Sequence, residues 1–185
     1  MISLQLLFVF IVNFVNIQQI QSRELIDSKE PKIIGGLPAS IEDEKHFVSI
    51  RMIAREETEG FGAGHRCGGT LINEKIVITA AHCLFTTRFG QLIPISEKDL
   101  SVALGTTYLK LRDENTVVRS VIKIIRHAQY NDSITTNDIG LLLLNDTAIV
   151  NGNPNTGVMK LTNKSPEVGE ECRISGFGHQ TWVRT

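Results

Sequence analysis

The chain has 185 residues, and its 19 Lys and Arg against 20 Asp and Glu give a net charge of −1. This balance excludes a strongly basic nucleic-acid-binding surface and an acidic solvating tail. Hydrophobic residues make up 42% and charged residues 21%, which is typical of a globular protein and not of a disordered one. The three cysteines are an odd number, so one of them pairs elsewhere, stays free or lacks its partner.

The first segment, residues 1–22, has no charged side chain and contains an apolar run from Leu6 to Val12. A membrane-spanning helix needs about 20 apolar residues, so this run is too short to span a bilayer. We interpret residues 1–22 as a secretory signal peptide cleaved near Ser22, with an uncleaved anchor and a buried core helix as the alternatives. We expect a secreted protein that has no membrane contact once the signal is removed, and disulfides are expected in that compartment.

Residues 23–32 are polar and charged, and we interpret them as a propeptide. The rest of the chain holds short apolar runs of strand length, separated by Gly, Pro, Asn and Asp. These runs cover residues 46–53, 76–78, 100–104, 117–125, 139–144 and 172–177. Such runs predict an all-β sandwich or barrel, and residues 151–166 are expected to form a long connection.

Three Asn-X-Ser/Thr sequons agree with secretion, and each is a candidate N-glycosylation site. They begin at Asn131, Asn145 and Asn163. Pro166 follows the third sequon and makes Asn163 the weakest acceptor.

Four segments then carry the chemistry of the chain. They are Lys32-Ile33-Ile34-Gly35-Gly36, Cys67-Gly68-Gly69-Thr70-Leu71-Ile72, Thr79-Ala80-Ala81-His82-Cys83 and Asp138-Ile139-Gly140-Leu141-Leu142. Together and in this order they closely resemble the trypsin/chymotrypsin-like serine proteases (peptidase family S1), from Ile33 to about Gly178. The resemblance implies a trypsin-like double β-barrel, with the first barrel at residues 33–158. Residues 159–185 would then be the linker and first strand of an incomplete second barrel.

The resemblance assigns His82 as the general base and Asp138 as the carboxylate that orients it. An acyl-transfer protease needs this pair because a hydroxyl nucleophile is weak until a base takes its proton. The chain order, His before Asp, is the one that the chymotrypsin type uses. Without the resemblance, His82 would be interpreted as a structural histidine and Asp138 as a turn residue.

Two further assignments follow from the resemblance. Cys67 and Cys83 match the family disulfide beside the catalytic histidine, and Lys32-Ile33 matches the site where a trypsin-like protease activates the zymogen. An exposed loop is the alternative for Lys32-Ile33. A zinc cluster of His65, Cys67, His82 and Cys83 is a poor alternative, because its spacing matches no common zinc pattern. We expect no metal and no cofactor, and we interpret His46, His65, His127 and His179 as structural or surface residues.

The nucleophile segment of the family, Gly-Asp-Ser-Gly-Gly, does not occur in the sequence. After Asp138 the serines are Ser165 and Ser175, and neither follows Gly-Asp. We therefore expect a carboxyl-terminally truncated chain that does not cleave peptides by itself and in which Cys172 has no partner. The specificity pocket of the family is also missing, so the sequence does not indicate after which residues the enzyme would cleave.

The leading interpretation is a secreted serine endopeptidase zymogen. Its partners would be protein or peptide substrates, an activating trypsin-like protease and protease inhibitors. A non-catalytic secreted homologue that binds or regulates a partner is the second interpretation. A prematurely ended product without a function is the third.

Overall fold

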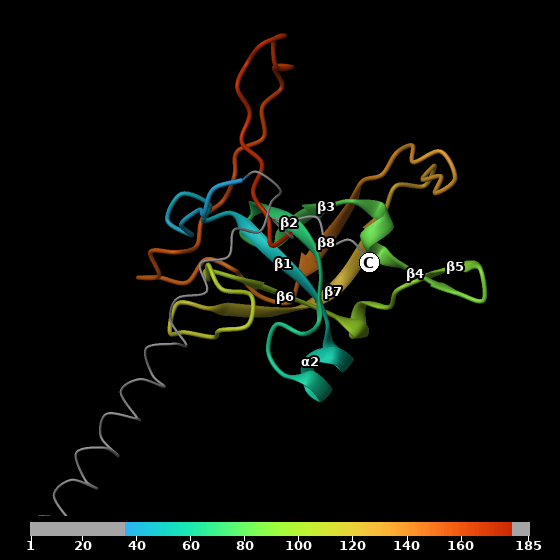
Figure 1. Ribbon diagram of the computed structural model, residues 1–185, viewed down its shortest axis with the longest axis horizontal. Coiled ribbons are helices and arrows are strands. Elements are labelled where there is room, and N and C mark those ends of the chain that lie inside the picture. The colour runs from blue at the N-terminus through green and yellow to red at the C-terminus, as the bar shows by residue number, and fades with distance from the viewer. Residues whose placement is uncertain (1–35, 179–185) are drawn as a thin grey trace, which may run out of the picture. The chain divides into compact units, whose positions relative to one another are not determined.

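Six antiparallel strands close into a barrel in the order β1-β2-β3-β8-β7-β6 (Figure 1). The strands are β1 (Phe47–Met52), β2 (His65–Asn73), β3 (Ile76–Thr79), β6 (Leu100–Leu104), β7 (Val117–Arg126) and β8 (Gly140–Leu144). Closure pairs every strand on both sides, so the barrel has no free edge. This computed structural model describes residues 36–178, and residues 39–178 form one unit that contains all the elements named here.

The inward side chains of the six strands fill the barrel. They include Val48 and Ile50 on β1, Leu71 on β2, Val77 on β3, Val102 on β6 and Leu142 on β8, all 0% exposed. The alternation of buried and partly exposed residues along β8 shows the period of two that half-buried strands follow. The all-β barrel expected from the sequence is therefore confirmed.

Smaller elements lie outside the barrel. β4 (Phe85–Arg88) and β5 (Gln91–Pro94) form a separate hairpin. The helix α2 (Ile53–Glu59) follows β1, and the 3-10 turns η1 (Ala81–Leu84) and η2 (Glu97–Asp99) precede β4 and β6. Within residues 36–178 no helix is long and apolar enough to cross a membrane.

The predicted strands agree with the barrel except for one. Five of the six runs overlap β1, β3, β6, β7 and β8, and Leu100–Leu104 matches β6 residue for residue. The expected strand at residues 172–177 is wrong, because these residues have no regular secondary structure. A strand exists only through hydrogen bonds to a neighbouring strand, and none pairs with this segment among the described residues.

Several elements were not predicted. β2 contains Gly68 and Gly69, which have low strand propensity. A glycine is needed at position 69 because an added Cβ would lie 2.8 Å from Cγ1 of Val77 on β3.

The helix α2 was also not predicted, because it has no buried residue and hence no apolar face that a sequence pattern could indicate. The signal peptide, the propeptide, Lys32, Ile33 and His179 lie outside the described residues.

Candidate active site

The barrel register brings His82 and Asp138 together, although they are 56 residues apart. β3 pairs with β8 in antiparallel register, and Thr79 at the end of β3 lies opposite Gly140 at the start of β8. His82 follows Thr79 by three residues on η1, and Asp138 precedes Gly140 by two. The end of one strand and the start of its neighbour therefore place the two side chains at the same end of the barrel.

Two hydrogen bonds join the pair. His82 Nδ1 lies 2.8 Å from Oδ2 of Asp138, and the backbone N–H of His82 donates to Oδ1 at 2.8 Å. A ring nitrogen that faces an ionised carboxylate carries the proton, so the network assigns the hydrogen to Nδ1. This tautomer leaves the lone pair on Nε2, which is the atom that can accept a proton from a nucleophile.

The environment keeps Asp138 ionised. Burial by itself raises the pKa of this carboxyl, since its side chain is only 20% exposed. The hydrogen bonds from the His82 ring, the His82 backbone and the Ala81 backbone lower it, and together they hold the pKa of Asp138 below its ordinary value. Asp138 is therefore a carboxylate at neutral pH and can stabilise an imidazolium on His82.

A disulfide between Cys67 and Cys83 ties β2 to the turn that carries His82. His82 Nε2 lies 3.4 Å from Sγ of Cys83. Cys67, His82 and Cys83 are close enough together to surround an ion. However, two sulfurs that are bonded to each other cannot act as thiolate ligands, so the site does not fit zinc. The structure thus disfavours the zinc alternative.

The other histidines lie elsewhere in the described unit. His65 Nδ1 lies 2.8 Å from Oγ of Ser49, His46 lies 3.5 Å from Glu44, and His127 accepts a hydrogen bond from the backbone of Gln129. No serine of the described residues is hydrogen-bonded to His82. The side chain of His82 is 56% exposed, so its outer face is open to solvent.

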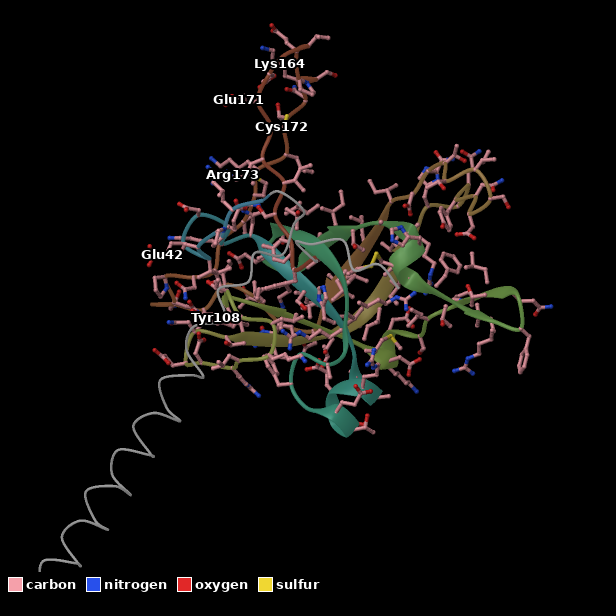
Figure 2. The ribbon with its side chains drawn as sticks, in the orientation of Figure 1. Glu42, Tyr108, Lys164, Glu171, Cys172 and Arg173 are labelled. Atoms are coloured by element: carbon pink, nitrogen blue, oxygen red, sulfur yellow. A yellow bond between two sulfur atoms is a disulfide. The ribbon has the colours of Figure 1, made fainter. Side chains whose placement is uncertain are left out.

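The remaining predicted site residues that lie within residues 36–178 are at the surface. Cys172 is a free, exposed cysteine that lies with Lys164 and Glu171 on a segment projecting from the barrel (Figure 2). Asn131, Asn145 and Asn163 are all exposed. Of these, Asn145 accepts a hydrogen bond from the backbone of Ser120 on β7 at 3.1 Å.

The class of protein follows from this geometry. A closed antiparallel barrel that carries a hydrogen-bonded His-carboxylate pair at the ends of adjacent strands is consistent with the trypsin-like serine proteases. The comparisons agree: a family model described as Trypsin matches residues 33–184. The chain therefore belongs to the trypsin family, which is a family of serine endopeptidases.

Individual relatives show the same similarity. The chain is 33% identical to Trypsin-3 of Homo sapiens over 150 residues, which cover 81% of this chain and 41% of that protein. It is 30% identical to Cathepsin G of Mus musculus and 31% identical to Trypsin I-P1 of Gallus gallus, each over 153 residues. Both of these matches cover 83% of this chain and 52% of the relative. The chain spans about half the length of the curated relatives that it matches.

Proposed function

We propose that the chain is part of a secreted serine endopeptidase in which His82 is the general base and Asp138 is the orienting carboxylate. The observation that carries the proposal is the doubly hydrogen-bonded His82–Asp138 pair between β3 and β8. The match to the Trypsin model supports the class of reaction. The pair is intact, which favours a catalytic protein over a non-catalytic homologue.

In the proposed reaction, the nucleophilic serine of the family, which is not among residues 1–185, adds to a peptide carbonyl. Its Oγ forms a bond to the carbonyl carbon while Nε2 of His82 takes the hydroxyl proton, and Asp138 stabilises the resulting imidazolium. His82 then gives the proton to the leaving amine as the C–N bond breaks. Water hydrolyses the acyl-enzyme by the same steps in reverse, so His82 acts first as a base and then as an acid.

We further propose that the protein is made as a zymogen and activated by cleavage between Lys32 and Ile33. The family match begins at Ile33, which supports this boundary. The charge-free, apolar residues 1–22 support secretion, and the exposed Asn131, Asn145 and Asn163 are the candidate glycosylation sites. The proposed partners are an activating trypsin-like protease, protein or peptide substrates and protease inhibitors.

For the domain limits we propose a first barrel at residues 33–158 and a connection to the second barrel from residue 159. Beyond β8 the chain still contacts the barrel, since the backbone of Met159 donates to Leu71 O on β2 at 2.8 Å. From residue 160 to residue 178 almost every residue is exposed, which supports a boundary near residue 158 between the barrel and the connection.

The test uses the full-length gene product, cleaved after Lys32 and assayed on a mixed set of peptide amides. We expect His82→Ala to lower kcat by about 10⁴- to 10⁶-fold, the range found for triad residues in related enzymes. The matched control is His46→Asn, which removes a histidine that lies just before β1 and pairs with Glu44, outside η1 and the loop before Asp138. Its kcat is expected to stay within about twofold of wild type, since surface changes away from the site have small effects.

Two outcomes would contradict the proposal. One is a cleaved wild-type protein without turnover, which would favour the non-catalytic interpretation. The other is activity that survives His82→Ala. We also expect a polypeptide of residues 33–185 alone to hydrolyse no peptide, because Ser165 and Ser175 do not stand in the nucleophile motif.

A further inference from the structure

The turn that carries His82 has few hydrogen bonds of its own. η1 spans only Ala81–Leu84, and the backbone N–H of Phe85 closes it by donating to His82 O. A single 3-10 turn leaves the carbonyl groups at its end without partners inside the turn. Besides the disulfide at Cys83 and the bonds to Asp138, the turn is held through the next three carbonyl groups, those of Cys83, Leu84 and Phe85.

Two arginines from different strands donate to all three carbonyl groups, and Leu84 O also accepts a hydrogen bond from the backbone N–H of Ile95 at 2.9 Å. Arg66 on β2 donates from Nε to Cys83 O at 2.8 Å and from Nη2 to Phe85 O. Arg126, the last residue of β7, donates from Nε and Nη2 to Leu84 O at 3.1 and 3.0 Å. Its Nη2 also donates to the carbonyl that follows β5, Ile95 O.

The second arginine also reaches the segment that leads to Asp138. Cζ of Arg126 lies 5.1 Å from the centroid of the Phe85 ring. The Phe85 ring in turn stacks on Tyr130, with the centroids 5.5 Å apart and the planes 28° apart. Tyr130 belongs to the loop between β7 and β8 that ends at Asp138. A column of guanidinium and two rings thus connects the residues just after His82 with the loop just before Asp138.

We propose that Arg66 and Arg126 are positioning residues for His82. They hold the turn so that the imidazole keeps its hydrogen bond to Asp138 and presents Nε2 in one orientation. The inference rests on the proposed function, because the position of His82 affects a rate only if His82 is the base. Neither arginine stands within one of the four family segments. Arg66 lies next to the expected disulfide cysteine Cys67, whereas only the fold brings Arg126 next to residues 84 and 85.

The forked shape of the guanidinium, and not only its charge, is needed to bond two carbonyl groups at once. Arg66 bonds two carbonyl groups that are two residues apart, and Arg126 bonds Leu84 O and Ile95 O. A lysine keeps the positive charge but is a point donor on a flexible stem, so it does not reproduce these paired bonds. Arg-to-Lys substitutions therefore separate geometry from charge.

The test measures kcat and KM for Arg66→Lys and Arg126→Lys in the full-length, activated protein. A misplacement of about 1 Å costs on the order of 10²-fold in rate, so we expect kcat to fall by about 10- to 100-fold. We expect KM to stay within about threefold, because a displaced base lowers the rate of the chemical step rather than ground-state binding. If Arg126→Lys does not fold, Arg66→Lys alone tests the inference, because Arg66 is exposed and its substitution leaves the core unchanged.

The matched control is Arg119→Lys. Arg119 also lies on β7 and also holds backbone carbonyls, since it donates to Thr147 O at 2.7 Å and to Val118 O at 2.9 Å. These carbonyls do not adjoin His82, so kcat is expected to stay within about twofold of wild type. If all three variants have the same kcat, the inference is overturned.

A second measurement does not depend on activity. The proton between His82 Nδ1 and Asp138 is expected to give a far-downfield resonance in the NMR spectrum of wild type and of Arg119→Lys. We expect that resonance to shift or broaden in Arg66→Lys and Arg126→Lys, and an unchanged resonance would overturn the inference. If wild type has no peptidase activity, the proposed function fails while this measurement still judges the positioning role.

Discussion

Asp138 receives hydrogen bonds from the ring and backbone of His82 and from the backbone of Ala81. These bonds exist only in the folded protein, where they hold the pKa of Asp138 below its ordinary value near 3.8 although burial opposes them. A carboxyl whose pKa is depressed by folding stabilises the fold above its unfolded pKa. That contribution is lost as the pH falls through the lower, folded value.

The corresponding prediction concerns Asp138→Asn. Above about pH 5 the variant is expected to have a smaller free energy of unfolding than wild type, because the amide cannot supply the ionised acceptor. Below about pH 4 wild type loses the same contribution by protonation, so the difference should shrink. Urea unfolding of both full-length proteins between pH 3 and pH 7 measures this difference in the free energy of unfolding. A difference that stays constant over this range would contradict the prediction.

Gly140 is the first residue of β8 and lies opposite Thr79 at the end of β3. A Cβ at this position would lie 2.5 Å from Cδ1 of Leu84 and 3.1 Å from Ile125 O. Leu84 is 0% exposed and shares η1 with His82, so its side chain has little room to shift and the crowding acts next to the turn. A side chain at position 140 would therefore crowd the core beside the turn that carries His82.

We expect Gly140→Ala to lower the free energy of unfolding by about 1–3 kcal/mol, as overpacking of a filled core does. It should also lower kcat, since the displaced turn carries the proposed base. Gly176→Ala is the matched control, because a Cβ there meets nothing within 4 Å and is expected to change stability by less than about 0.5 kcal/mol. Thermal unfolding checks both variants, and equal effects at the two positions would argue against the crowding explanation.

At the scale of elements, the ion pair between Arg51 and Glu56 joins α2 and the loop after it to β1. Arg51 on β1 is 0% exposed, and its Nη1 lies 3.2 Å from Oε2 of Glu56 on α2. Glu56 also accepts hydrogen bonds from the backbones of Gly62 and Gly64. Arg51 further donates to Ser49 and Leu109, and its guanidinium lies 4.0 Å from the Phe61 ring centroid. Burial lowers the pKa of Arg51 against the opposing effect of Glu56.

Arg51→Met is expected to destabilise the protein by about 3–5 kcal/mol, the usual cost of leaving one partner of a buried pair without the other. The matched control is Arg55→Met on α2, which breaks the exposed pair with Glu59 and should have little effect. Denaturant unfolding of the two variants makes the comparison. A loss at Arg51 no larger than the loss at Arg55 would show that the buried network does not stabilise this segment.

Elements differ in how well the sequence predicts them. β6 has alternating apolar residues and β8 is a nearly continuous apolar run, and turn-forming residues bound both. The sequence pattern therefore predicts the extent of these two strands. The hairpin β4–β5 is largely exposed and its residues have no apolar face, so nothing in the pattern indicates it. Residues 172–177 show the opposite case, because a suitable pattern forms no strand when no neighbour pairs with it.

At the scale of the whole molecule, the barrel explains why distant motifs act together. The two motifs, Thr79-Ala80-Ala81-His82-Cys83 and Asp138-Ile139-Gly140, flank strands that are neighbours in the sheet. In the chain, four strands lie between the motifs and Asp138 follows His82 by 56 residues. The disulfide and the arginines of β2 and β7 then hold the turn between them. The site is therefore a property of strand order and register, and not of any single segment.

The sequence by itself determined the class of fold, the family, and the residues His82, Asp138, Cys67 and Cys83 as candidates. It could do so because apolar alternation and short motifs are local properties of the chain. The tertiary structure alone decided that His82 and Asp138 meet at 2.8 Å, that Arg51 is buried against Glu56, and that Arg66 and Arg126 hold the turn after His82. Such contacts join residues far apart in sequence, and only the closure and register of the barrel bring them within hydrogen-bonding distance.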